Sequence, residues 1–181
     1  MDPIEIINRY YEAGSAAWEI LVGHSRAVER YAAEICRQHP ELGADEQFVS
    51  EAAMLHDIGI CRTDAPSIHC HGTEPYICHG ILGAQMLREL GLERHALVCE
   101  RHTGAGISVD DIDAQQLPLP RRDMLPVSIE ERIVCYADKF FSKSRQLDRA
   151  KSLEQARRSV AKHGGASAER FEVLHSMLHI I

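Results

Sequence analysis

The chain has 181 residues, a length that suits one domain with a substantial buried core. Its formal net charge of −7 and the lack of a run of lysines and arginines argue against binding to nucleic acid polymers or anionic membranes. No apolar run approaches the length of a membrane span, and the acidic start has no apolar signal region, so we expect a cytoplasmic protein.

The hydrophobic pattern predicts helices along almost the whole chain. Apolar residues at three- and four-residue steps from Trp18 to Ile35 predict a long helix with one buried stripe. Capping residues such as Asp45, Ser128 and Ser152 predict further helix starts. The expected helices cover about residues 3–13, 18–35, 46–58, 76–90, 93–103, 129–141 and 153–163, with a last one carrying residues 171–178. We therefore expect an all-α fold, a compact bundle of about seven to nine helices.

Two segments lack the helical pattern, residues 59–75 and residues 104–127. Both are rich in glycine, proline and aspartate, which are typical of loops. Loops this long inside a compact domain usually carry function. We therefore expect these two segments to contribute to the selection of a substrate.

Five of the predicted helices each carry one histidine or aspartate on the apolar face, where a polar group needs a partner. These residues are His24, His56, His79, His102 and Asp138, and Asp57 follows His56 directly. A single inward histidine is usually a hydrogen-bonded core residue, and a single inward aspartate can pair with a lysine or arginine. Four imidazoles and two carboxylates are hard to satisfy by hydrogen bonds alone, so together they indicate a metal site.

The order His … His-Asp … His … His … Asp resembles the HD-domain superfamily of metal-dependent phosphohydrolases, and His56-Asp57-Ile58-Gly59 matches its HDIG variant. The segment Tyr136-Ala137-Asp138-Lys139 looks like the last motif of that family. The resemblance covers roughly residues 23–143. We expect a single HD-type domain, residues 1–181, in which the C-terminal helices of residues 152–181 pack on this core.

The resemblance implies a first metal held by four residues, His24, His56, Asp57 and Asp138. It implies that Asp57 bridges to a second metal, which is also held by His79 and His102. Nitrogen and oxygen ligands of this kind suit Fe, Mn, Co, Ni or Zn better than Ca or Mg, so we expect one or two divalent transition metal ions. If only one ion binds, His79 or His102 is expected to contact phosphate or to act as a general acid.

Basic residues beside these motifs are the expected phosphate contacts, although each also suits an exposed surface position: Arg26, Arg101, Lys139 and Lys143. The pattern places Lys143 one turn beyond Lys139 on the same helix, which would bring their two ammonium groups together. We expect Asp57 and Lys139 to be the residues that take part in catalysis.

The expected function is a metal-dependent phosphohydrolase, a phosphomonoesterase or phosphodiesterase in which metal-activated hydroxide attacks a nucleotide or a small phosphorylated metabolite. Two alternatives rest on the same residues. One is a mixed-valent di-iron oxygenase of the same fold, and the other is a regulator that binds a nucleotide without turning it over. The apolar face of residues 171–181 could belong to the core or to a homodimer.

Overall fold

The computed structural model describes residues 1–143 and 146–180. Within those ranges it contains nine α-helices, four short 3₁₀ helices and one two-stranded antiparallel sheet, which confirms the predicted all-α fold. The α-helices are α1 Pro3–Ile7, α2 Ala16–Gln38, α3 Glu46–Leu55, α4 His79–Glu89, α5 Glu93–Arg101, α6 Val109–Gln115, α7 Ile129–Asp138, α8 Leu153–Ala161 and α9 Gly165–Leu178. The 3₁₀ helices are η1 Pro40–Leu42, η2 Ile58–Arg62, η3 Pro66–Ile68 and η4 Tyr76–Cys78, and the strands are β1 Asp64–Ala65 and β2 Cys70–His71.

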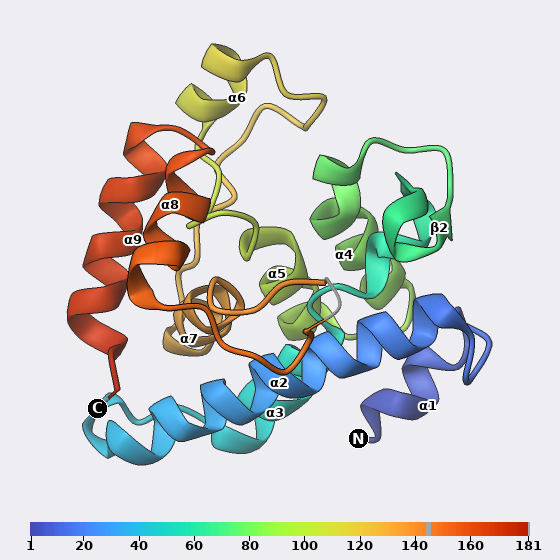
Figure 1. Cartoon of the computed structure of the whole chain (residues 1–181), viewed down its shortest axis with the longest axis horizontal. Coiled ribbons are helices and arrows are strands. Elements are labelled where there is room, and N and C mark those ends of the chain that lie inside the picture. The colour runs from blue at the N-terminus through green and yellow to red at the C-terminus, as the bar shows by residue number, and fades with distance from the viewer. Residues whose placement is uncertain (144–145, 181) are drawn as a thin grey trace.

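The long helix α2 runs along one side of the molecule and contributes to two buried apolar clusters (Figure 1). One cluster joins α2 and α3 to α7, α8 and α9, and its largest fully buried side chains include Tyr136 and Phe171. The other cluster joins α1 and α2 to α4 and α5, around Leu55 and Leu87. Full burial of such a side chain contributes roughly 1.5–3 kcal/mol to folding. Helices of both clusters therefore hold the candidate ligands in place.

The predicted capping residues begin the helices as expected. The side chains of Asp45 and Ser128 accept hydrogen bonds from backbone amides in the first turns of α3 and α7. Ser152 and Gln155 form a reciprocal capping box at the start of α8.

Three glycines allow α4 to lie against the backbone of its neighbours. A Cβ atom at Gly59 would lie 2.2 Å from the His79 carbonyl oxygen and 2.3 Å from the Gly83 nitrogen. A Cβ atom at Gly80 would lie 2.7 Å from the Cys99 carbonyl oxygen, and one at Gly83 would lie 2.7 Å from Cys99 Sγ. This close packing fixes the distance between the His56-Asp57 segment and the histidines at the start of α4 and the end of α5.

Several predicted boundaries were wrong. The predicted helix of residues 3–13 ends at Ile7, and the predicted loops contain short elements: η2, β1, η3 and β2 in residues 59–75, and α6 in residues 104–127. The helix predicted over residues 129–141 ends at Asp138. Beyond it the amides of Phe140 and Phe141 bond to the third preceding carbonyl, so the chain tightens and leaves the helix. Lys143 therefore lies in a loop and not one helical turn beyond Lys139.

The apolar stripe of α9 is used by the core, because Phe171, Leu174 and Leu178 are all buried in the cluster that contains α7 and α8. Ile181, at the end of the face suggested for a homodimer, lies outside the described residues. A homodimer remains a prediction. No helix in the described ranges combines the length and apolar character needed to cross a membrane.

Candidate metal centre

The six residues predicted as ligands converge on one region, five of them from the ends of helices and His24 from the interior of α2. They form two sets, in each of which the candidate ligand atoms lie within 4.8 Å of one another. One set contains His24, His56, Asp57 and Asp138, and the other contains Asp57, His79 and His102. Asp57 is shared by both sets, as the resemblance implied.

The two oxygens of the Asp57 carboxylate face different sets. Oδ2 lies 3.2 Å from His24 Nε2 and 3.0 Å from His56 Nε2. Oδ1 lies 3.3 Å from His79 Nε2 and 3.4 Å from His102 Nε2. Asp57 is fully buried, so both oxygens are directed into the protein and away from bulk solvent. This division of one carboxylate is the arrangement expected of a ligand shared between two cations.

His56 and Asp57 reach one centre because the helix ends between them. His56 still has helical backbone angles at the end of α3, whereas Asp57 has φ −107° and ψ 10° and begins η2. The change of direction lets two adjacent side chains converge instead of pointing about 100° apart around a helix. His79 begins α4, His102 caps α5 and Asp138 ends α7, so these ligands also lie where elements start or stop.

Backbone carbonyls determine which nitrogen of three histidines carries the proton. The Nδ1 atoms of His56, His79 and His102 lie 2.6–2.7 Å from the carbonyl oxygens of Ala53, Tyr76 and Cys99. Since a carbonyl oxygen can only accept, each Nδ1 must carry a hydrogen, and in the neutral ring Nε2 presents its lone pair to the centre. This outer hydrogen bond is typical of histidines that bind a metal.

His79 and His102 provide a test of whether a cation fits this site. Their Nε2 atoms lie 3.1 Å apart, and burial lowers the pKa of His79 to about 3 and also lowers the pKa of His102. Two neutral rings with protonated Nδ1 atoms would direct two lone pairs at each other, which is repulsive unless a cation lies beside them. Because both rings also face Asp57 Oδ1, a metal ion fits the donors of this set.

Two lysines stabilise the charged forms of the carboxylates. Lys143 Nζ lies 2.5 Å from Asp57 Oδ2, and Lys139 Nζ lies 2.7 Å from Asp138 Oδ2. Burial alone would raise the pKa of Asp57, but the charges of Lys143 and then His56 outweigh it and hold that pKa well below its usual range. Lys139 has the same effect on Asp138. Both acids are therefore ionised, as metal ligands must be.

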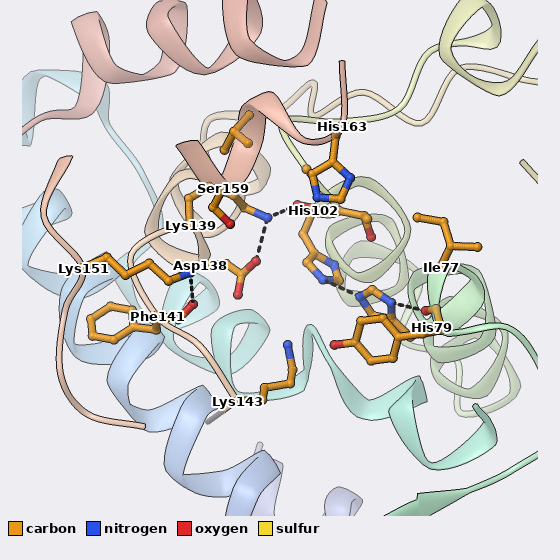
Figure 2. A pocket seen from close by; sticks show the side chains of 14 residues that line it. Ile77, His79, His102, Asp138, Lys139, Phe141, Lys143, Lys151, Ser159 and His163 are labelled. Carbon is orange, nitrogen blue, oxygen red and sulfur yellow. Dashed lines mark hydrogen bonds and ion pairs between the residues drawn. The ribbon is translucent and has the colours of Figure 1, made fainter. Parts of the chain in front are cut away.

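A cavity of about 280 Å³ opens beside the centre and is lined by His79, His102 and Asp138 (Figure 2). Lys139 and Lys143, two of the residues expected to contact phosphate, also line it. Further lining residues were missed by the sequence analysis, among them Tyr76, Lys151, Ser159 and His163. They lie outside the metal-ligand pattern, and no spacing in the sequence marked them.

The two predicted arginines are not among the residues that line this cavity. Arg26 is exposed on α2, because two positions beyond His24 correspond to about 200° around a helix. Arg101 is directed to α7, where its guanidinium lies 2.9 Å from a carboxylate oxygen of Glu131. The structure thus brings the two lysines to the centre and not the two arginines.

The fold and the site together define a helical protein with clustered histidine and aspartate ligands, and residues 21–142 match the HD domain family. The chain belongs to this family. Metal-dependent hydrolysis is the activity that the HD domain suggests.

Three relatives share part of this sequence. The uncharacterized protein MJ0778 of Methanocaldococcus jannaschii is 43% identical over 123 residues, which are 66% of this chain and 65% of that protein. A tRNA (cytidine(56)-2'-O)-methyltransferase of Thermoplasma volcanium is 32% identical over 94% of this chain but 45% of its own length. A protein of the same name from Picrophilus torridus is 34% identical over 76% of this chain and 35% of its own length. The chain thus spans between about a third and two thirds of the length of these relatives. No solved structure matches it.

Replacement of His102 with alanine is expected to remove one of two bound metal ions and to leave the fold intact. The variant loses one hydrogen bond and some buried volume but also the repulsion with His79, so the free energy of unfolding should fall by no more than about 3 kcal/mol. Loss of a residue that only hydrogen-bonds to a metal ligand lowers activity by roughly 10–100-fold. Loss of His102, a candidate ligand itself, should lower activity by more than this. Metal analysis and circular dichroism measure both effects. An unfolded variant would show that His102 is a core residue instead.

Proposed function

We propose that the protein is a metal-dependent phosphohydrolase that acts on a nucleotide or another small phosphorylated metabolite. The observation that carries this proposal is the division of the Asp57 carboxylate between two histidine sets beside a cavity lined with lysines. His24, His56, Asp57 and Asp138 would hold one ion, and Asp57, His79 and His102 would hold a second. When bound, such ions activate water for attack and stabilise negative charge on phosphoryl oxygens.

The residues of the chain itself orient the substrate. Lys139 is held by two groups of the centre, Asp138 Oδ2 at 2.7 Å and the His102 carbonyl oxygen at 3.0 Å. An ammonium fixed in this way offers its third hydrogen in a defined direction, and it is the expected contact of a phosphoryl oxygen. Figure 2 shows Lys143 on the opposite side of the cavity from Lys139, so it is expected to contact a second phosphoryl oxygen.

The size and charge of the site favour a small substrate. Pockets for drug-sized ligands measure about 300–1,000 Å³, and the cavity of about 280 Å³ lies just below that range. A net charge of −7 also disfavours binding to a polyanion. Two of the relatives are named for methyl transfer to tRNA, and they are much longer than this chain. For the segment represented here we propose hydrolysis of a small molecule and not methyl transfer.

The proposal is tested by stripping the protein with a chelator and adding Mn²⁺, Fe²⁺, Co²⁺, Ni²⁺ or Zn²⁺ in turn. Phosphate release from p-nitrophenyl phosphate and from a panel of nucleotides and sugar phosphates is then measured with and without oxygen. We expect metal-dependent release that is indifferent to oxygen. Oxygen consumption without phosphate release would favour a di-iron oxygenase, and tight nucleotide binding without turnover would favour a regulator.

A further inference from the structure

A third lysine, Lys151, lines the cavity beside the metal centre and is held by the chain that follows α7. Its backbone amide donates to the Phe140 carbonyl oxygen at 2.7 Å, and its Nζ donates to the Phe141 carbonyl oxygen at 3.1 Å. Figure 2 shows the side chain approaching from the side of Phe141, away from His79. Two bonds from one residue to consecutive carbonyls fix its position before any ligand binds.

Lys151 differs from the other two lysines in its electrostatic partners. Lys139 and Lys143 are each paired with a ligand carboxylate, at 2.7 Å and 2.5 Å. Across the described residues, Lys151 forms no ion pair with an aspartate or glutamate, and a backbone carbonyl takes one of its three hydrogens. Burial lowers its pKa, and the positive charges of Lys139 and Lys143 lower it further against the opposing effect of Asp138. An anion in the cavity would compensate this charge.

Helix α8 and the turn that follows it supply further polar groups to the cavity. Ser159 and His163 both line it, and burial and then Lys139 lower the pKa of His163, so its ring is neutral near pH 7. These residues and Lys151 follow the segment of residues 21–142 that matches the HD domain. They therefore lie outside the segment that matches the HD domain.

We propose that Lys151 forms a second anion subsite in the cavity that Ser159 and His163 also line, and that the substrate carries another acidic group besides the phosphoryl group at the metal centre. The inference rests on the proposed phosphohydrolase function. The three ammonium groups at the cavity face only two carboxylates, and bound metal ions add more positive charge. A substrate with two anionic groups matches this excess better than a simple phosphomonoester. The small cavity limits that substrate to a compact molecule such as a sugar bisphosphate or a phosphorylated acid.

Two pairs of probes isolate the second anionic group: glucose 6-phosphate with glucose 1,6-bisphosphate, and glycerol 3-phosphate with 3-phosphoglycerate. The wild-type enzyme should favour the doubly acidic member of at least one pair by about 10-fold or more in kcat/KM. Lys151→Ala should reduce kcat/KM for that member by at least about 10-fold and for its partner by less than about 3-fold, since one charge-assisted contact is worth roughly 1.5–3 kcal/mol. Lys151→Arg should retain most of the preference.

Lys162→Ala is the matched control, because Lys162 is exposed at the end of α8 and does not line the cavity. It should leave the preference unchanged. The subsite would be overturned if Lys151→Ala lost kcat/KM equally for both members of a pair. It would also be overturned if the wild-type enzyme showed no preference within either pair.

If no phosphate is released with any metal, the proposed function fails, and the same probes are titrated calorimetrically into metal-loaded protein. If the wild-type protein binds the doubly acidic probe more tightly than its partner and Lys151→Ala abolishes this difference, the subsite is still supported. If the wild-type protein shows no such difference in binding, the subsite is refuted.

Discussion

Replacement of Asp57 with alanine should abolish metal binding at both sites and lower kcat/KM for any phosphorylated substrate by on the order of 10³-fold or more. Asp57 is the only described residue that belongs to both ligand sets. Its Oδ2 faces His24 and His56, and its Oδ1 faces His79 and His102, so no remaining carboxylate can replace it at the second site. Metal content and activity are measured on the same preparation. Retention of two ions per chain would refute the bridging role.

The same substitution leaves the ammonium of Lys143 without its carboxylate, and breaking a buried ion pair costs roughly 3–5 kcal/mol. A failure to fold would therefore be uninformative unless the charge is also removed. The double variant Asp57→Ala with Lys143→Met removes both charges and should fold, yet it should still bind no metal. Asp64→Ala, at an exposed position in β1, is the control for an aspartate that is not a ligand and should leave the metal content unchanged.

Gly59→Ala should produce a large loss of stability, on the order of 3 kcal/mol or more in the free energy of unfolding. The added Cβ atom would lie 2.2 Å from the His79 carbonyl oxygen and 2.3 Å from the Gly83 nitrogen, and both are backbone atoms that cannot rotate away. Any relief must move η2 away from α4. That movement would lengthen the 3.3 Å distance from Asp57 Oδ1 to His79 Nε2, so the second metal should be lost as well.

Urea denaturation of the metal-free protein measures this effect, and Gly165→Ala is its matched control. A Cβ atom at Gly165, in the first turn of α9, would have no neighbour within 4 Å. Because alanine favours a helix over glycine by up to about 1 kcal/mol, this control should be neutral or slightly stabilising. A change of less than about 1 kcal/mol for Gly59→Ala would show that η2 and α4 are not held at the observed distance.

The ligands could be predicted from the sequence because each lies on a regular apolar stripe. His24 and Asp138 occur at helical spacing from buried neighbours, and the structure brings both into the same set, with His24 buried and Asp138 partly exposed. The division of Asp57 between two sets followed from the resemblance, since no periodicity indicates which oxygen faces which neighbour. The short helix α6 was missed because it has seven residues, three of them aspartates, and so lacks an apolar face long enough to recognise.

Residues that act through tertiary contacts could not be predicted in this way. Lys151 reaches the cavity only because its backbone and side chain bond to Phe140 and Phe141, ten or more positions earlier in the chain. Arg101 precedes a ligand in the sequence, but Glu131 on α7 binds its guanidinium away from the cavity. Of the basic residues close in sequence to a ligand, Lys139 lines the cavity and Arg26 and Arg101 do not, because the direction of a side chain depends on the turn of the helix and on its partner.

We propose that two metal ions share Asp57 and together support hydrolysis of a phosphorylated substrate. The most direct test is a titration of chelator-treated protein with Mn²⁺, in which bound metal per chain and phosphate release are followed together. Activity should rise as the second ion binds and should reach its maximum at two ions per chain. Full activity with one ion, or phosphate release that does not depend on metal, would contradict this proposal.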